Sequence, residues 1–363
     1  MGHAMDKFRL LMMVIILITA SYPGVAQDKN TDLDLILEVP PADKGKPSGE
    51  TEGIAKEEEN PLDRDFTIAL EAYRERDYET ARQMWSELSD AGHGISMHNL
   101  AVLKWRGQGG PRERSAALEL FKNAGEVDVG PSLHAWGVLS LKGAGMPADP
   151  AEAVRYFEAA SATGHLPSTY NLALAHLKGI GGAGDQSLGM ELMEAAAEGG
   201  LARAQYDLGN LLYQGTYSDA DKSAARLWFE RAADNGDPFG YYNLALMQLS
   251  GEGGVADPEL AVINLTEAAE MGAVPAQLRL AHILAQGGTG VTSDPEAAYV
   301  WFSIAGAFGA KNALENAKRL SHRLDAAALK KAQKTAAGFK PKQPVVADPG
   351  AQSPQDIPKT AQQ

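Results

Sequence analysis

The chain has 363 residues, a formal net charge of −14 and no cysteine. The acidic balance opposes nucleic-acid binding, which needs a basic surface that displaces counterions from phosphate. The lack of cysteine excludes disulfides, thiolate metal sites and a cysteine nucleophile. Length alone favours two or three globular domains, but a fixed repeat period, described below, overrides that expectation.

The first 26 residues have the order of a secretory signal peptide. Lys7 and Arg9 precede an apolar run of ten residues, 10–19, and small residues follow at 24–26. This order predicts cleavage after Ala26. The run is about half of the roughly 20 residues that span a bilayer, so an uncleaved anchor is the less favoured alternative. We therefore expect an exported protein, periplasmic or secreted, that is not membrane-embedded once the signal peptide is removed.

Two further segments are predicted to be disordered. Residues 27–62 are acidic and proline-rich and hold few large apolar side chains to offset backbone entropy. Leu33, Leu35, Ile36 and Leu37 are the exception, and they form either a docking peptide or, as we favour, an incidental apolar patch. Residues 341–363 are rich in Pro, Gln and Ala and are predicted to form a tail.

Between these segments glycine recurs at a fixed interval of 36 residues, which is typical of stacked repeats. The glycines are Gly107, Gly143, Gly179, Gly215, Gly251 and Gly287. Each follows a helical stripe, so each is predicted to end the first helix of a hairpin in the left-handed conformation. An aspartate then predicts the start of the second helix. These aspartates are Asp149, Asp185, Asp221, Asp257 and Asp294, of which the last is one residue late and indicates an insertion near Thr289.

The second helices carry a bulky residue between small ones, at spacings of four and three that place all three on one face. Phe157, Phe229 and Phe302 occupy the bulky position and are predicted to be core. An opening hairpin is predicted to start near Asp65, as its N-cap, and a closing hairpin to run over 314–339. Such end units cover core faces that a terminal repeat would otherwise expose.

The unit resembles the Sel-one-like repeat (SLR) family, which is related to the tetratricopeptide repeats. The family pattern is A-x-x-x-L-G-x-x-Y-x-x-G, a loop with Asp, and A-x-x-W/Y-x-x-x-A-A-x-x-G. The fourth full unit matches at Ala204, Leu208, Gly209, Tyr213, Gly215, Asp221, Ala225, Trp228, Phe229, Ala232, Ala233 and Gly236. Over residues 63–340 the resemblance implies an all-α fold. This is a right-handed α/α solenoid of about seven helical hairpins plus a C-terminal capping hairpin, with the first helices on the concave face.

The resemblance also implies an adaptor or scaffold with a protein or peptide partner. Some envelope members of the family resemble regulators of a membrane sensor kinase, and others resemble assembly factors for exported polysaccharide; no residue selects between them. Cysteine-rich members have been associated with β-lactam binding or hydrolysis, and this chain departs from them. The interpretation is an exported adaptor that regulates an envelope signalling or assembly system. The alternatives are an enzyme of cell-wall or β-lactam chemistry and a multi-copy structural scaffold.

No catalytic constellation, such as G-x-S-x-G, H-E-x-x-H or a phosphate loop, occurs in the sequence. We therefore expect no enzyme activity and no cofactor. His98 and His134 are one repeat apart, but two ligands without a third give weak support for a metal, and none is predicted.

Three columns of the first helices, at the same 36-residue spacing, are the candidate partner-binding residues. Aromatic rings offer contact area at little rotamer cost, and basic tips fix acidic groups of a ligand. The alternative is that the aromatic column only packs between repeats. The candidate residues are His98, His134, Tyr170, Tyr206, Tyr242, Trp105, Tyr213, Arg106, Lys142 and Lys178.

Overall fold

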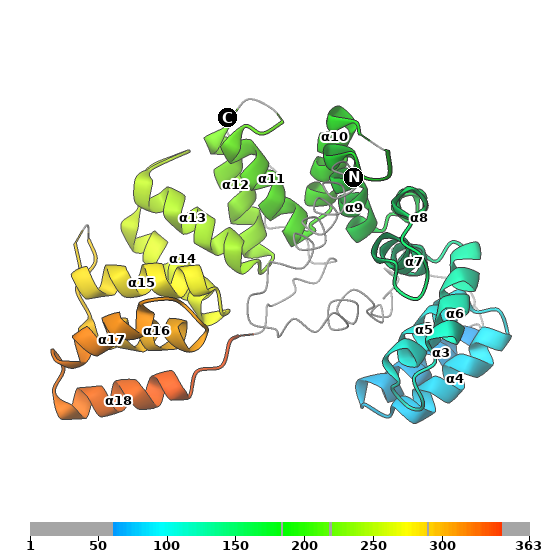
Figure 1. Ribbon diagram of the computed structural model, residues 1–363, viewed down its shortest axis with the longest axis horizontal. Coiled ribbons are helices and arrows are strands. Elements are labelled where there is room, and N and C mark those ends of the chain that lie inside the picture. Colours follow the sequence, from blue (N-terminus) through cyan, green and yellow to red (C-terminus); the bar gives the residue numbers. More distant parts are fainter. Residues whose placement is uncertain (1–60, 183, 218–219, 289, 343–363) are drawn as a thin grey trace, which may run out of the picture. The chain divides into compact units, whose positions relative to one another are not determined.

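The computed structural model describes residues 61–342, except residues 183, 218, 219 and 289 (Figure 1). The predicted signal peptide and nearly all of the two segments predicted to be disordered lie outside the described residues. The described part consists of α-helices, one 3-10 turn (Ile180–Gly182) and no strand. The helices are α3 (Pro61–Arg74), α4 (Tyr78–Asp90), α5 (Gly94–Arg106), α6 (Arg114–Glu126), α7 (Gly130–Lys142), α8 (Pro150–Ala162), α9 (Leu166–Lys178), α10 (Gln186–Glu198), α11 (Ala202–Gln214), α12 (Lys222–Asp234), α13 (Pro238–Ser250), α14 (Pro258–Glu270), α15 (Val274–Gln286), α16 (Pro295–Ala307), α17 (Ala313–Ser321) and α18 (Ala326–Ala337).

The fold is a helical-repeat solenoid. In the described residues α3 to α16 form seven hairpins, and α17 and α18 close the end. The described residues up to Leu192 and those from Met193 onward make two compact units, which are described separately and are called unit 1 and unit 2. Within each unit a first helix packs on the second helix of its own hairpin and on the second helix of the hairpin before, as α7 does on α8 and α6.

Five of the six predicted left-handed glycine stops are confirmed, and Gly287 is the exception. The first five glycines of the 36-residue series adopt left-handed conformations with φ between 63° and 75°. Gly287 also has a positive φ of 68°, but its ψ of −168° is different, and a bridge between Gly288 and Val291 follows. The altered loop agrees with the extra residue predicted there from the late Asp294.

The five predicted aspartate caps are also confirmed, because each accepts a hydrogen bond from a backbone N–H two or three residues later. The prediction of Asp65 as an N-cap is wrong. The opening helix α3 begins at Pro61, so Asp65 lies inside its first turns. Proline fits the first helical position because its missing N–H would have no helical partner there.

The cores lie between the two helix rows of each unit. Phe157 in unit 1, and Phe229 and Phe302 in unit 2, are each 2 % exposed, which confirms them as core residues. Small residues in the first helices make room for these rings. A Cβ atom placed on Gly137 would lie 2.7 Å from the Phe157 ring, and one on Gly209 would lie 2.8 Å from the Phe229 ring. Glycine here sets the close approach of the two helices in a hairpin.

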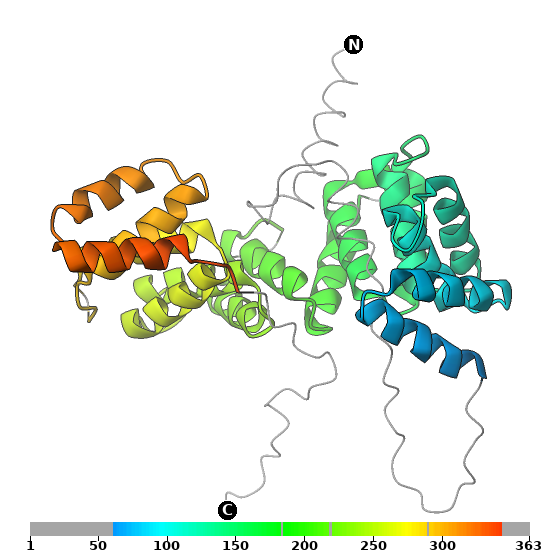
Figure 2. The same cartoon turned by 90° about the horizontal axis from the view of Figure 1, so that it is seen from below.

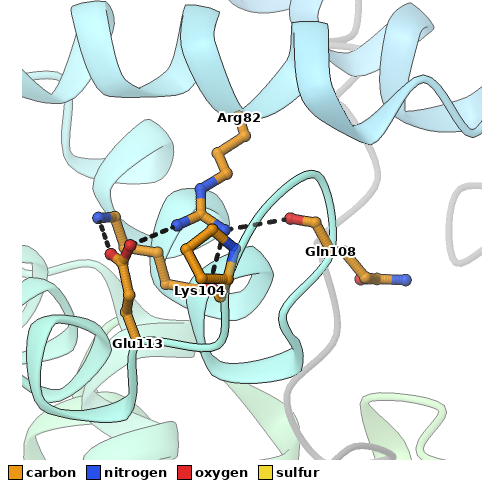
Figure 3. Close-up of polar contacts among 5 residues, drawn as sticks. Arg82, Lys104, Gln108 and Glu113 are labelled. Carbon is orange, nitrogen blue, oxygen red and sulfur yellow. Dashed lines mark hydrogen bonds and ion pairs between the residues drawn. The ribbon is translucent and has the colours of Figure 1, made fainter.

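The loop after a first helix is clamped onto the preceding hairpin (Figure 3). Arg82 of α4 donates hydrogen bonds to the carbonyl oxygens of Gln108 (3.4 Å) and Pro111 (3.0 Å) and pairs with Glu113 at 3.0 Å. Lys104 Nζ contacts the same carboxylate at 2.5 Å. In unit 2 the equivalent Arg226 donates to the carbonyl oxygen of Val255 at 3.0 Å. These arginines fix the register between neighbouring repeats.

The C-terminal end of unit 2 is closed by two helices and a short strap. Both α17 and α18 pack on α16 (Figure 2). Beyond α18 the ring of Phe339 lies 5.8 Å from Trp301, measured between ring centroids. Lys342 then donates its backbone N–H to the carbonyl oxygen of Glu270 at 2.8 Å, and its Nζ lies 3.2 Å from a carboxylate oxygen of Glu267. The described part of the strap runs to Lys342. No helix within 61–342, outside the gaps, has the length and apolar character that crossing a bilayer requires.

Candidate partner-binding surface

Two sets of contacts define the rotation of each first helix about its own axis. The rings of His98, His134 and Tyr206 lie 5.4, 5.7 and 6.1 Å from the phenylalanine of their own second helix. A Cβ atom on Gly240 of α13 would lie 2.8 Å from the methyl carbon of Ala232 on the preceding second helix. Because residues advance by about 100° around a helix, each first helix also has positions that lie between these two directions.

We call those positions the inner face. They begin one residue after the His/Tyr column and continue three and seven residues later. The inner face of unit 1 comprises Asn99, Val102 and Arg106 in α5, Ala135, Val138 and Lys142 in α7, and Asn171, Leu174 and Lys178 in α9. The inner face of unit 2 comprises Asp207, Asn210 and Gln214 in α11, Asn243, Leu246 and Ser250 in α13, and Arg279, His282 and Gln286 in α15.

The predicted aromatic column lies beside this face and differs between the units. His98, His134 and Tyr170 in unit 1 are only 1, 7 and 8 % exposed. Tyr206 and Tyr242 in unit 2 are half-buried. The histidines and Tyr170 therefore offer little surface to a partner, whereas the two tyrosines of unit 2 offer more. A direct binding role for the column stays a prediction.

Buried histidines of unit 1 are held by serines of the neighbouring first helix. The Nδ1 atom of His98 lies 2.7 Å from Ser132 Oγ, and that of His134 lies 2.9 Å from Ser168 Oγ. Ser168 also contacts the Nδ1 atom of His165 at 2.9 Å. Burial lowers the pKa of His134 to about 3 and that of His165 to about 4. The imidazoles are therefore neutral members of the core, and no substrate can reach a hydroxyl group so enclosed.

The other predicted aromatic residues are also held in place. Trp105 is buried, and the guanidinium of Arg114 lies 5.3 Å from its ring centroid. Tyr213 is half-buried and donates its hydroxyl to Glu252 at 2.6 Å, a bond that raises the pKa of the tyrosine. Lys222 lies over the same ring and pairs with Glu252. Tyr213 thus fixes a loop of the following hairpin.

An amide pair on the inner face of unit 2 was not among the candidate residues. Asn243 Nδ2 of α13 donates to Asn210 Oδ1 of α11 at 3.1 Å, and Asn210 Nδ2 donates to the carbonyl oxygen of Tyr206 at 3.1 Å. Both amides are half-buried. The sequence held a signal for Asn243 alone, because Asn171, Asp207 and Asn243 recur at 36 residues one position after the aromatic column, and it held none for Asn210.

The inner faces of the two units differ in charge and in burial. Unit 1 carries the predicted basic column Arg106, Lys142 and Lys178, all half-buried, whereas the same positions in unit 2 hold Gln214, Ser250 and Gln286. The apolar column of unit 1 is also buried, since Val102, Val138 and Leu174 are 0, 4 and 8 % exposed. Their counterparts in unit 2 are half-buried or exposed.

Neither face contains a recognisable reaction centre. No group of three or more His, Asp or Glu side chains within the described ranges is placed to hold a metal ion. The titratable groups of the inner faces are dispersed along the helices, with none on α13 and one or two on each of the other first helices. An arrangement of this kind contacts an elongated ligand at repeated intervals, which is how solenoid surfaces bind.

The sequence model of the Sel1 repeat matches residues 94–127, 130–165, 166–201, 202–237, 238–272 and 274–307, which are the six full units. Repeats of this kind generally mediate protein–protein interaction, and their scaffolds are typically non-catalytic. No curated protein sequence matches the chain.

Two solved structures share the fold. One is c5321, a protective antigen of uropathogenic Escherichia coli with an SLR fold, at 24 % identity and a TM-score of 0.65. The match covers 77 % of this chain and 60 % of that chain, so this chain spans less than two thirds of that relative. The other is a Sel1 repeat protein from Oxalobacter formigenes, at 23 % identity and a TM-score of 0.59, with 66 % of this chain and 96 % of that chain covered.

Proposed function

The chain belongs to the Sel1 repeat family, and we propose that it is an exported adaptor that binds a protein or peptide partner on the inner faces of its first helices. The finer role is regulation of an envelope signalling or assembly system. Export is supported by the order of charged, apolar and small residues in 1–26. The N-terminal sequence of protein recovered from the cell envelope tests it, with Gln27 as the expected first residue.

The amide pair of unit 2 carries the proposal. Asn243 and Asn210 bridge two successive first helices, and Asn243 Oδ1 makes no hydrogen bond among the described residues. A half-buried amide with spare donors and acceptors is suited to the backbone N–H and C=O groups of an extended peptide. Tyr206 lies beside the pair and adds a half-buried ring.

The candidate partner-binding residues contribute to the proposed surface in two ways. Tyr206 and Tyr242 supply apolar contact area in unit 2. Arg106, Lys142 and Lys178 supply positive charge in unit 1 and favour a partner with acidic groups. The buried His98 and His134 support the surface from behind, because they hold neighbouring first helices together.

The test is a crosslinking pull-down from the native envelope with the wild-type chain and with Asn210→Ala/Asn243→Ala. We expect the double variant to lose the captured partner while its melting temperature changes little, since both side chains are half-buried. Asn123→Ala is the matched control, because Asn123 is an exposed amide on the second helix α6. Equal capture by the wild type and the double variant contradicts the proposal. So does turnover of a chromogenic β-lactam by the purified protein.

A further inference from the structure

The C-terminal end of unit 2 is basic, although the chain as a whole is acidic. Residues 308–342 contain nine Lys and Arg but two Asp and Glu, whereas the complete chain has a formal net charge of −14. This stretch comprises the closing helices α17 and α18 and the strap that follows them (Figure 1). An excess of positive charge at one end of an acidic chain indicates a contact with an anionic partner.

Most of these basic side chains are not neutralised by the protein itself. Lys331 pairs with Glu296 at 2.8 Å, and Lys342 pairs with two carboxylates of α14. Asp325 accepts hydrogen bonds from the first backbone N–H groups of α18. The other seven bases are exposed and make no ion pair in the described part of the chain. They are Lys311, Lys318, Arg319, Arg323, Lys330, Lys334 and Lys340.

Apolar side chains lie among these bases. Phe308, directly after α16, is 40 % exposed, and Leu314 of α17 is 60 % exposed. Leu314 reaches the end of α16, because its Cδ2 atom lies 2.5 Å from the position of a Cβ atom on Gly306. The ring of Phe339 in the strap lies 6.2 Å from that of Phe308, measured between ring centroids. Side chains from α16, α17 and the strap therefore form an open apolar group.

Lysines flank the apolar group. Lys311 lies in the loop before α17, and Lys340 follows the phenylalanine of the strap. Lys318 is four residues after Leu314, so the two side chains share one face of α17. That face is exposed, whereas the opposite side of the helix is buried. We define the closing surface as Lys311, Lys318, Lys340, Phe308, Leu314 and Phe339.

We propose that the closing surface binds the anionic headgroups of a phospholipid bilayer and holds the protein at the membrane surface. Lysines around exposed apolar side chains suit this interface, because the amines meet phosphates while the apolar groups enter the boundary between headgroups and acyl chains. A bilayer also supplies many headgroups, which move to meet lysines from separate elements. The rest of the chain is acidic and is repelled by the same headgroups, so this end is the point of contact. The closing surface is separate from the inner faces, and its role goes beyond the proposed adaptor function.

Co-sedimentation with vesicles of defined composition tests the proposal. We expect the purified protein to sediment with phosphatidylglycerol vesicles, and not with phosphatidylcholine vesicles, at low salt. Added salt should release much of the bound protein, because exposed charges are screened beyond about 10 Å at ~0.1 M salt. Equal binding to the two kinds of vesicle, or binding to neither, overturns the proposal.

Charge reversal at the closing surface tests its place in the fold. Lys311→Glu/Lys318→Glu/Lys340→Glu should lower the affinity for phosphatidylglycerol vesicles at least about tenfold. The three side chains are exposed and unpaired in the described part of the chain, so the melting temperature should change little.

The matched control reverses three exposed charges in unit 1. Arg74→Glu/Lys122→Glu/Arg155→Glu has the same net charge as the closing-surface variant and the same N-terminal segment. A difference between the two variants therefore reports on position and not on total charge. We expect the control to retain most of the wild-type affinity. Equal affinities of the two variants overturn the proposal.

The apolar group distinguishes a bilayer from an acidic protein as the occupant. Leu314→Ser should weaken vesicle binding, and Ile68→Ser should not, because Ile68 is 45 % exposed but belongs to unit 1. Soluble polyglutamate serves as the probe for an acidic protein and should displace the vesicles poorly. Complete displacement at an equal concentration of negative charge, or unchanged binding by Leu314→Ser, overturns the assignment to lipid.

These outcomes are separable from those of the pull-down. Asn210→Ala/Asn243→Ala should bind vesicles as the wild type does, and the closing-surface variant should still capture the partner from a solubilised envelope. If the closing-surface variant binds vesicles normally, the membrane contact fails and the adaptor proposal stands. If the amide variant captures the partner normally, the adaptor proposal fails and the membrane contact stands.

Discussion

The imidazole of His134 and the hydroxyl of Ser168 come from successive first helices, and their Nδ1 and Oγ atoms are 2.9 Å apart. A second imidazole, His165, contacts the same hydroxyl at 2.9 Å, and its ring lies 4.9 Å from that of His134. One hydroxyl therefore joins two neutral imidazoles inside unit 1. Protonation of either ring would place a charge in the core.

We expect this cluster to make unit 1 sensitive to acid. The pKa of His134 is lowered to about 3 and that of His165 to about 4, from 6.5, so the unfolded chain binds protons first as the pH falls. Stability is full above pH 6.5 and decreases below it, until the folded-state pKa values are reached. Each imidazole contributes a slope of about 1.4 kcal/mol per pH unit in that window.

Urea unfolding at several pH values between 7.5 and 4.5 measures this slope. His134→Gln cannot titrate and should show a smaller loss of stability on acidification than the wild type. His322→Gln is the control, because His322 is exposed in the loop after α17. A slope that does not differ between His134→Gln and the wild type would contradict the assignment.

Removal of the Phe229 ring from the core side of α12 is predicted to lower the stability of the protein strongly. Phe229 is 2 % exposed, so Phe229→Ala should reduce the free energy of unfolding by about 3–5 kcal/mol. Leu227→Ala removes an apolar side chain from the same helix, but Leu227 is 42 % exposed and should cost less than about 1 kcal/mol. Denaturant melts of both variants give the comparison. Similar losses at the two positions would show that the orientation of α12 is wrong.

Two glycines with positive φ allow the cost of a steric clash to be compared with the cost of backbone strain alone. Gly253 has a φ of 68°, and a Cβ atom there would lie 2.2 Å from the carbonyl oxygen of Lys222. Gly200 has a φ of 92° but no neighbour within 4 Å of its Cβ position. Gly200→Ala should therefore cost only the left-handed strain of about 1–2 kcal/mol, and Gly253→Ala clearly more. Melting temperatures of equal value would argue against the close approach of loop and helix.

The arginine clamp predicts a local change in dynamics. Arg82 is largely buried and holds two loop carbonyls and Glu113, so Arg82→Gln should cost about 1–3 kcal/mol. Hydrogen exchange should quicken in the loop 107–113 and change little in α8. Arg64→Gln serves as control, because the exposed Arg64 of α3 pairs, among the described residues, with its neighbour Asp65 alone. Unchanged exchange in the loop would mean that other contacts hold it.

The repeat architecture was predictable from the sequence because the backbone itself requires particular residues at the helix ends. Left-handed helix stops need glycine, and the aspartates bond to free N–H groups, so both recur with the period. The start of α3 was not predictable in the same way. Asp65 and Pro61 are both residue types that often begin a helix. The sequence does not show which of the two is the first residue of α3.

The face of each first helix was harder to assign, because one residue corresponds to about 100° of rotation. His134 turns toward Phe157, whereas its neighbour Ala135 starts the inner face. The size and aromatic character of a side chain do not show whether it packs in the core or binds a partner. The sequence analysis therefore chose the aromatic column as the candidate binding residues. The amide pair of Asn210 and Asn243 depends on contacts between repeats, which only the structure supplies.

The strap at the end of unit 2 determines where the chain can be shortened. Lys342 lies between the carboxylates of Glu267 and Glu270, and Pro341 lies near Gly272. The sequence analysis predicted that the solenoid ends at Lys340. A truncation there would remove Lys342 and leave the carboxylates of Glu267 and Glu270 on α14 without their counter-ion. Fragments for crystallisation, and C-terminal fusions in particular, should therefore retain Lys342 and begin any added sequence after it.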